Sequence, residues 1–493
     1  MVALGYFMRV PRNPNENSRM AAVLAVYWQG TLSIDAYHRV GPVRTTDESF
    51  HAGHYYSDKA PGSALLAAIG YAPVYAWERA TGRKAPYVVR KYAMTLAADG
   101  LPVAAALCAL FVLASSAAGP GAGAAATLAG LVATPLLPFG TALFGHALAG
   151  ALLFLAFALV RHLARGPLPP RWRELAGAGA LLGLAAATEY TTAPATLLIA
   201  ACGLFRLGQH GQLGRARTWV GPLLGVAPFG LAVALHNLSC FGSPFSLGYE
   251  NLASPFYRTF HDHGLVGIGA PRLDVVYFLT LHPARGLFVS APALLLAFPG
   301  LWFMFRRPGW RAEAALCGAV FLSFLIVNSG FGLWWGGYTY VARHLIPAVP
   351  FLLLPLAFLP RVWWWAGIPL LLASAGQTLV ASFGDPFSND AFLFDRLREL
   401  ERAGGGLVPW RGSWSVRWDV WPDLRSRSST GAWIGFALNA GRLLGLTGPA
   451  SALPLVAAVS WLFARAGRPV RAPPRLRPAL EAPPGEPARQ GAT

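Results

Sequence analysis

The stretch TALFGHALAGALLFLAFALVRHL, residues 141–163, decides the class of the fold. It contains no acidic residue, and its one arginine, Arg161, stands near its carboxyl end. An α-helix rises 1.5 Å per residue, so about 20 apolar residues cross the hydrocarbon core of a bilayer. The following residues, RHLARGPLPPRWR at 161–173, are rich in arginine. The stretch therefore predicts a membrane-spanning helix with a basic end.

The same kind of segment recurs along all 493 residues, of which 55% are hydrophobic and only 13% charged. A soluble domain carries about a quarter charged residues. We therefore predict an all-α polytopic membrane protein with about 11–13 transmembrane helices. Apolar segments lie near 61–79, 93–117, 121–138, 141–163, 175–187, 190–206, 219–238, 286–305, 313–330, 344–360, 362–382 and 432–465. A short apolar stub at residues 1–10 is counted with them, and we expect the natural chain to start further upstream.

The net charge of +18 comes from arginine-rich connections between these segments, which indicates topology and not nucleic-acid binding. Basic connections at 81–91, 161–174, 206–219, 306–313 and from 466 onward are predicted to be cytoplasmic. The loops 11–60, 239–285, 331–343 and 383–431 then face outward, and we expect short amphipathic helices in the second and fourth. Between 61 and 163 the crossings do not alternate correctly, so one segment there is predicted to be interfacial or re-entrant.

We expect one transmembrane domain, residues 1–465, followed by a disordered basic cytoplasmic tail, residues 466–493. The abundance of Ala, Gly, Pro and Arg is typical of a GC-rich bacterial gene, which predicts the bacterial cell membrane. The four cysteines show no paired spacing, so neither a disulfide framework nor a metal site is predicted. A divalent cation on the acidic residues of the first loop is left open without a specific indication.

The first outward loop holds the densest polar cluster, including Asp35, Asp47, Glu48 and the stretch HYYSDKAPG at 54–62. Solvated loop charges need no function, and we prefer that interpretation for Asp47 and Glu48. Lys59 differs, because it is one of only three lysines and precedes a proline and an apolar segment. Proline suits the first turn of a helix, and a helix amino terminus attracts anions. Lys59 is therefore predicted to bind phosphate, although an interfacial anchor is the alternative.

Three motifs in chain order resemble the GT-C superfamily of membrane glycosyltransferases. An acidic residue opens the first loop in NENSRMAAVLAVYWQG, the YYSDKAPG stretch ends it, and WWGGYTYVARHLIPAVPFLLLP follows at 334–355. The pattern is most similar to bacterial lipid A aminoarabinose transferases and protein O-mannosyltransferase-like enzymes. Asn15–Glu16 stands where those families have two acids. TEYTTAP at 188–194 adds an acid at an outward helix end.

The resemblance implies sugar transfer from a polyprenyl-phosphate donor to a lipid, glycan or protein acceptor at the extracytoplasmic face. It implies Glu16 as the catalytic base and Lys59 as the cation that stabilises the leaving phosphate, which matches what this chemistry requires. Arg343 is a second phosphate candidate and Arg285 a third. The predicted substrate-binding residues are Arg19, Asp35, His54, Tyr56, Asp58, Glu189, Tyr249, Arg343 and His344.

Two other classes of function remain. A transporter or lipid flippase places ionisable groups near the bilayer midplane and often has inverted repeats, whereas here the charges concentrate in loops and no repeat is visible. A non-catalytic GT-C-like subunit is the other, which the Asn15 departure keeps open. Finding Glu16 and Lys59 in different compartments would favour that subunit. An acidic residue deep in the membrane would favour the transporter.

Overall fold

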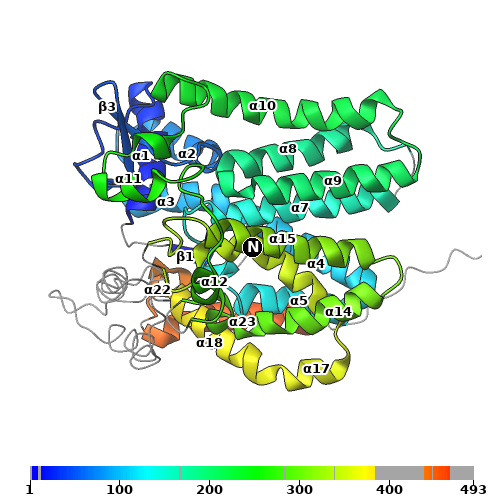
Figure 1. The fold of residues 1–493 in the computed structure, drawn as a ribbon. Coiled ribbons are helices and arrows are strands. Elements are labelled where there is room, and N and C mark those ends of the chain that lie inside the picture. Colours follow the sequence, from blue (N-terminus) through cyan, green and yellow to red (C-terminus); the bar gives the residue numbers. More distant parts are fainter. Residues whose placement is uncertain are drawn as a thin grey trace, which may run out of the picture.

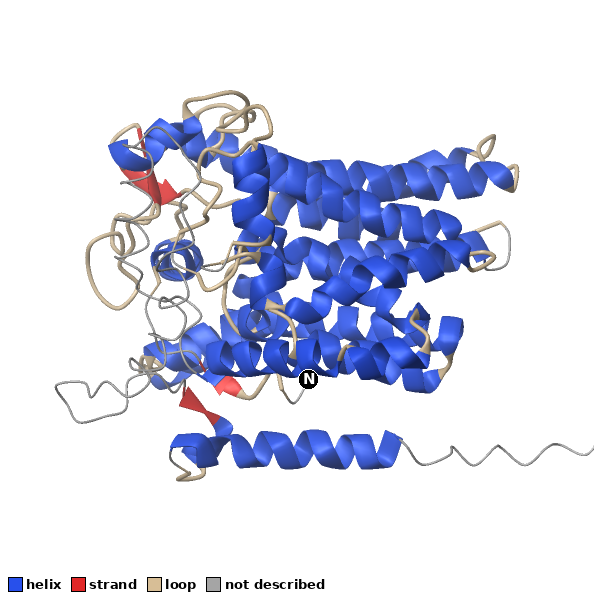
Figure 2. Cartoon of the chain, turned by 60° about the horizontal axis from the view of Figure 1, so that its bottom comes forward, coloured by secondary structure: helices blue, strands red, loops and turns tan. Residues whose placement is uncertain are grey.

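The structure is a computed structural model that describes residues 3–8, 13–165, 169–282, 285–337, 339–383, 438–446 and 448–466. Its helices run side by side, and most of the longer loops gather at one end of the array (Figures 1 and 2). This arrangement confirms the predicted helical membrane protein. The loop predicted at 383–431 and the tail from 467 onward lie outside the described residues, apart from Phe383.

Five helical stretches within the described residues are long and apolar enough to cross a membrane. They are α3–η1–α4 (Tyr87–Ala118), α7 (His146–Arg165), η2–α9 (Tyr190–Gln209), α10 (Ala216–Phe241) and α15 (Arg311–Ser329). In the first, η1 (Leu96–Gly100) is a π-helical turn between α3 (Tyr87–Thr95) and α4 (Leu101–Ala118). In the third, η2 (Tyr190–Thr192) precedes α9 (Ala193–Gln209). Further apolar helices are α5 (Pro120–Val132), α8 (Trp172–Thr188) and α18 (Ile368–Phe383).

Several predicted spans are interrupted where prolines recur. The segment predicted at 344–360 is η5 (Arg343–Ala348), α16 (Val349–Leu353) and η6 (Leu354–Phe358), with prolines at 347, 350 and 355. The segment at 286–305 divides into α13 (Leu287–Ser290), η4 (Pro292–Leu296) and α14 (Ala297–Arg306). Proline lacks the N–H group and clashes with the preceding turn, so an α-helix cannot continue through it unchanged. Short helices α6 (Leu136–Gly140) and α17 (Arg361–Ala366) complete this part.

The segment predicted as a span at 61–79 forms α2 (Gly62–Thr81), which is 20 residues long but falls outside the set of membrane-crossing helices. It packs on α3 and η1, and it lies with α1 (Pro14–Gln29) at the loop end of the array (Figure 1). Buried residues from α1, α2 and α3, including Met20, Tyr71 and Met94, form a separate small core. Among the segments predicted between 61 and 163, α2 thus packs with α1 and α3 around a core of its own.

Two short antiparallel sheets interrupt the helices. The described part of the amino-terminal stub, residues 3–8, contains no helix: β1 (Phe7–Met8) pairs with β4 (Leu438–Asn439), which corrects its count as a span. The second sheet is the hairpin of β2 (Glu48–His51) and β3 (His54–Ser57) in the first loop. The loop at 239–285 contains the expected short helices, η3 (Gly248–Asn251), α11 (Pro255–His261) and α12 (Leu273–Thr280). The last described elements are α22 (Ala440–Leu443), η7 (Gly448–Ala452) and α23 (Leu453–Ala466).

Candidate active site

The β2–β3 hairpin determines which acidic residues face Lys59. In its register Glu48 pairs with Ser57, so the next residues outward, Asp47 and Asp58, lie opposite each other. The turn uses two residues with positive φ, Ala52 at 49° and Gly53 at 87°. Such a two-residue turn matches the twist of the strands and fixes their register. The hairpin therefore brings two carboxylates to the point where the chain enters α2.

Lys59 lies between these two carboxylates. Its Nζ is 2.9 Å from Asp47 Oδ2 and 2.7 Å from Asp58 Oδ2. Burial alone would lower the pKa of Lys59, but the two carboxylates outweigh it and raise the pKa. Burial raises the pKa of Asp58. For Asp47 the effect of burial is opposed by the Lys59 ammonium and, more weakly, by Arg343 and Arg19, so its pKa is lowered. The lysine is therefore charged, and Asp47 is an ionised carboxylate.

Glu16 lies in a different ion pair. It stands in the first turn of α1, whose Asn13 cap accepts a hydrogen bond from the Asn15 amide. Its side chain is fully buried: Lys91 Nζ is 2.7 Å from Oε2, and the Leu143 amide donates to Oε1 at 3.0 Å. Both oxygens are occupied by protein groups, and neither of these contacts is to Lys59. This geometry differs from the expected role of Glu16 beside an acceptor hydroxyl, and favours a structural role.

Arg19, one turn further along α1, joins the loop to the helix bundle. Its Nη2 donates to the Phe144 carbonyl at 3.1 Å and lies 3.3 Å from Glu189 Oε1, while its Nε donates to Ser63 Oγ at 2.7 Å. The Nδ1 of His146 lies 3.4 Å from the same Glu189 oxygen. Arg19 and Glu189, both predicted as site residues, are thus brought together in one buried cluster.

The Gly145 position makes this cluster sterically tight. Gly145 has a φ of 77°, and a Cβ there would lie 2.7 Å from Glu189 Oε1 and 3.1 Å from Arg19 Nη2. A side chain would strain the backbone and displace the carboxylate. The cluster therefore depends on a glycine immediately before α7.

Arg343 and His344 open η5 and are covered by the glycine-rich loop before it. A Cβ on Gly336, whose φ is 67°, would lie 2.7 Å from His344 Nε2 and 3.0 Å from Arg343 Nε. These two side-chain nitrogens are buried and have no hydrogen-bond partner among the described residues. The charges of Asp47 and Glu189 act on Arg343, yet none of the described ion pairs includes it. Arg343 is thus a half-buried residue whose Nε keeps bonding capacity for a ligand.

Tyr249 reaches the site through contacts between the loop at 11–60 and the loop at 239–285. Ser49 Oγ donates to the Gly248 carbonyl at 2.7 Å, and the Ala253 amide donates to the Glu48 carbonyl at 3.0 Å. The ring of Tyr249 stacks on His261 with centroids 5.1 Å apart. Burial raises the pKa of Tyr249 to about 12, and Lys59 acts in the opposite direction. Tyr249 is therefore a neutral phenol near the Lys59 ammonium.

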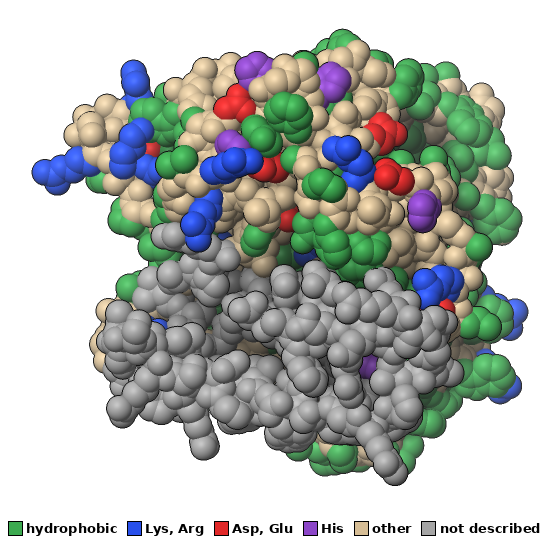
Figure 3. Space-filling view, turned by 60° about the vertical axis from the view of Figure 1, so that its left-hand side comes forward, with side chains coloured by type: hydrophobic (Ala, Val, Ile, Leu, Met, Phe, Trp, Pro, Cys, Tyr) green, Lys and Arg blue, Asp and Glu red, His purple; other side chains and the backbone are tan. Residues whose placement is uncertain are grey.

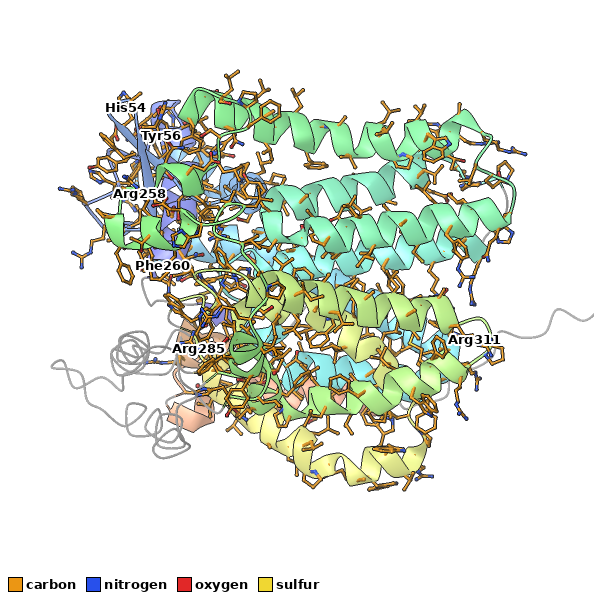
Figure 4. The ribbon with its side chains drawn as sticks, in the orientation of Figure 1. His54, Tyr56, Arg258, Phe260, Arg285 and Arg311 are labelled. Atoms are coloured by element: carbon orange, nitrogen blue, oxygen red, sulfur yellow. The ribbon has the colours of Figure 1, made fainter. Side chains whose placement is uncertain are left out.

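Three predicted substrate-binding residues lie on the outer side of the hairpin. His54 and Asp35 form an exposed pair, with His54 Nδ1 2.6 Å from Asp35 Oδ2. Tyr56 packs edge-on against Phe241 at 5.8 Å. Figure 4 shows His54 and Tyr56 near β3 at the loop end, whereas Arg311 lies at the opposite end of the array. Acidic, basic and histidine side chains gather over the visible part of the loop end in Figure 3. Arg285 donates to the carbonyls of Trp335 and Gly337 and thereby holds the loop.

Sequence reasoning undervalued Asp47, and it missed Lys91 as the ion-pair partner of Glu16 and His146 as a close neighbour of Glu189. The signal for Asp47 was the hairpin register, which places it opposite Asp58. Among the described residues no group of three His, Cys, Asp or Glu side chains is arranged to hold a metal ion.

The described residues form an array of apolar helices with a cluster of charged loop residues at one end, which is the architecture of an integral membrane protein. No protein-family model matches the chain, and no curated protein sequence matches it. The crystal structure of ArnT from Cupriavidus metallidurans bound to undecaprenyl phosphate is 16% identical, with a TM-score of 0.51, over 82% of this chain and 71% of that one. This likeness confirms the predicted resemblance at the level of the fold.

Two further structures were found with lower scores. ArnT from Cupriavidus metallidurans in the apo state is 16% identical over the same shares of both chains, with a TM-score of 0.48. The archaeal oligosaccharyltransferase AglB from Archaeoglobus fulgidus, in complex with an inhibitory peptide and a dolichol-phosphate, is 13% identical. That match covers 81% of this chain and 56% of AglB, with a TM-score of 0.46.

Proposed function

We propose that the chain is a glycosyltransferase that transfers a sugar from a polyprenyl-phosphate donor to an acceptor hydroxyl at the extracytoplasmic face of a bacterial cell membrane. The observation that carries the proposal is the Lys59 ammonium held between Asp47 and Asp58, together with Arg343, whose charge acts on Asp47 and whose buried Nε has no hydrogen-bond partner among the described residues. Two cations suit a phosphate, because an ammonium acts as a compact charge and a guanidinium can bind it with two hydrogen bonds. ArnT, whose fold is similar, binds undecaprenyl phosphate, which supports this donor class.

The reaction needs a base and a stabilised leaving group. The acceptor oxygen attacks the anomeric carbon, its proton passes to a carboxylate, and the bond from that carbon to the phosphate oxygen breaks. Inversion at the anomeric carbon is the expected outcome. The polyprenyl phosphate leaves with one more negative charge, which Lys59 and Arg343 stabilise. We assign the base to Asp47 and not to Glu16, because both oxygens of Glu16 are held by Lys91 and Leu143.

The distribution of basic residues supports the extracytoplasmic side. Arg311 lies at the end of the array opposite His54 and Tyr56 (Figure 4). The predicted cytoplasmic connections at 161–174, 206–219 and 306–313 follow or precede α7, α9, α10, α14 and α15. Because basic loops stay on the cytoplasmic side, the loop end with the site faces outward in this proposal.

A transporter remains the second candidate because of Asp99. It lies in η1 within the Tyr87–Ala118 span, and its side chain is fully buried. An ionisable group within a span is a functional candidate by default, and π-helical turns occur often at functional sites. However, the charges of Arg19, Glu16 and Glu189 act on Asp99. It therefore belongs to the layer beneath the candidate active site, which favours the enzyme.

The test is sugar transfer from a panel of radiolabelled polyprenyl-phosphate sugars in membranes that contain the wild type, Lys59→Ala, Asp47→Asn or Glu16→Gln at matched expression. We expect wild-type transfer that is lost in the first two variants. Transfer that survives both substitutions would refute the assigned site. Transfer with none of the donors, together with ion-driven uptake that Asp99→Asn abolishes, would favour the transporter.

A further inference from the structure

The charges around Lys59 are unfavourable for a phosphate that arrives from outside. One ammonium is shared by two carboxylates, at 2.9 Å from Asp47 and 2.7 Å from Asp58, so its charge is already met by groups of the protein. A lysine ammonium has three donors, and two of them are used here. A phosphate that binds the third would stand beside two carboxylates, and like charges at such distances repel. A phosphate can therefore bind Lys59 strongly only if one carboxylate leaves.

The two carboxylates are held to different degrees. Asp58 has a side chain only 5% exposed, and its other oxygen accepts a hydrogen bond from Ser18 Oγ at 3.4 Å. Its backbone is in close contact with Gly248, where a Cβ would lie 2.8 Å from the Asp58 carbonyl oxygen. Asp47 is 19% exposed and precedes β2, and its described ion pair is the one with Lys59. Asp47 is thus the carboxylate that can leave.

We infer that Asp47 and the donor phosphate compete for the Lys59 ammonium, so that binding of the donor releases Asp47 to act as the base. The inference rests on the proposed function and adds a regulatory step to it. In the ligand-free protein the Lys59 ammonium and the Asp47 carboxylate neutralise each other's charge. When the phosphate takes the lysine, the carboxylate loses the cation that stabilised its ionised form. A carboxylate without that partner accepts a proton from an acceptor hydroxyl more readily.

The exchange at Lys59 determines the order in which donor and acceptor bind. An acceptor that enters first meets a carboxylate still bound to Lys59, and its hydroxyl is not activated. The donor therefore has to bind before the acceptor can react. Arg343 contributes to the exchange, because its unpaired buried nitrogen gives the arriving phosphate a second cation as Asp47 leaves. The reacting atoms balance as before: the acceptor proton goes to Asp47, and the phosphate leaves on Lys59 and Arg343.

The test is a double-mutant cycle on binding of undecaprenyl phosphate to the full chain in lipid nanodiscs, followed by intrinsic fluorescence. We expect Asp47→Asn to bind about tenfold more tightly than the wild type, because it removes the competitor for Lys59. In the Lys59→Gln background the same substitution should change the affinity less than about twofold. Glu48→Gln is the matched control, because it removes the charge of a neighbouring carboxylate whose described contact is with His38 and not with Lys59.

Undecaprenol and inorganic phosphate are the comparison ligands. If Asp47→Asn increases the affinity for undecaprenyl phosphate equally with Lys59 and with Lys59→Gln, the effect is simple repulsion and the exchange is overturned. No increase in affinity in either background would overturn it as well. If Lys59→Gln binds undecaprenyl phosphate too weakly to titrate, the comparison of Asp47→Asn with the control Glu48→Gln decides whether the exchange occurs. Tightening by Asp47→Asn alone then supports the exchange, and equal tightening by Glu48→Gln overturns it. A wild type that binds undecaprenyl phosphate no better than undecaprenol refutes the proposed function instead. Equal binding of inorganic phosphate would keep the exchange and assign it to a soluble phosphate.

Discussion

Replacing Glu16 should reduce stability more than it affects chemistry. Its carboxylate is fully buried, with Lys91 Nζ 2.7 Å from one oxygen and the Leu143 amide 3.0 Å from the other. The pair joins the first turn of α1 to α3, and the amide joins both to the loop before α7. In Glu16→Gln the amide contact can persist through the side-chain carbonyl, but the buried Lys91 ammonium loses the carboxylate that lies 2.7 Å from it.

The expected loss in the free energy of unfolding follows from the burial of this ion pair. Removing one partner of a buried ion pair leaves an uncompensated charge and typically costs about 3–5 kcal/mol. We expect a loss of this size in the free energy of unfolding for Glu16→Gln. The double variant Glu16→Gln/Lys91→Met removes both charges and should regain about 1–3 kcal/mol, the usual coupling between residues in contact.

The free energy of unfolding is measured by titration with sodium dodecyl sulfate in mixed micelles, and transfer is measured in parallel at a temperature where every variant is folded. Glu174→Gln, on a half-exposed residue at the start of α8, is the matched control and should change stability by less than about 0.5 kcal/mol. Full stability of Glu16→Gln together with lost transfer would refute this reasoning and return the catalytic role to Glu16.

Three further outcomes follow from the same contacts. Lys59→Ala should lower the transfer rate at least about 100-fold while the protein stays folded, and Lys59→Arg should recover part of it; an unchanged rate for the alanine variant would exclude Lys59 from the leaving-group site. Burial raises the pKa of Asp47, but Lys59 outweighs burial and holds it below its usual 3.8, so the ion pair stabilises the fold above about pH 4. This stabilisation is lost as the pH falls through the lowered pKa. The thermal midpoint of the wild type should therefore fall towards that of Asp47→Asn between pH 6 and pH 3, and a constant difference would contradict the pairing. Gly145→Ala should cost about 1–3 kcal/mol of unfolding free energy and lower transfer, because the residue needs a φ of 77° and its Cβ would meet Glu189. The control Gly121→Ala, whose Cβ would meet no atom within 4 Å, should leave both unchanged.

Much of the architecture was predictable because it depends on local pattern. The apolar length of 141–163 and the arginines after it predicted α7 and its basic end, which the structure confirms. Prolines in 344–360 were visible in the sequence, but how they divide the segment into η5, α16 and η6 was not predicted. Whether α2 is a membrane span was ambiguous from the sequence, because its length of 20 residues suits a span while its composition does not.

The pairing of charges was decided by the tertiary structure alone. From the sequence, Glu16 and Lys59 were predicted to act in one site as base and cation, since both lie where a loop meets a helix. The structure instead pairs Glu16 with Lys91, which is 75 positions away, and Lys59 with Asp47, across a hairpin. The sequence determines which segments prefer the membrane, because transfer into the bilayer depends on each segment's own side chains. It does not reveal which carboxylate meets which cation, because that depends on strand register and on packing between distant helices.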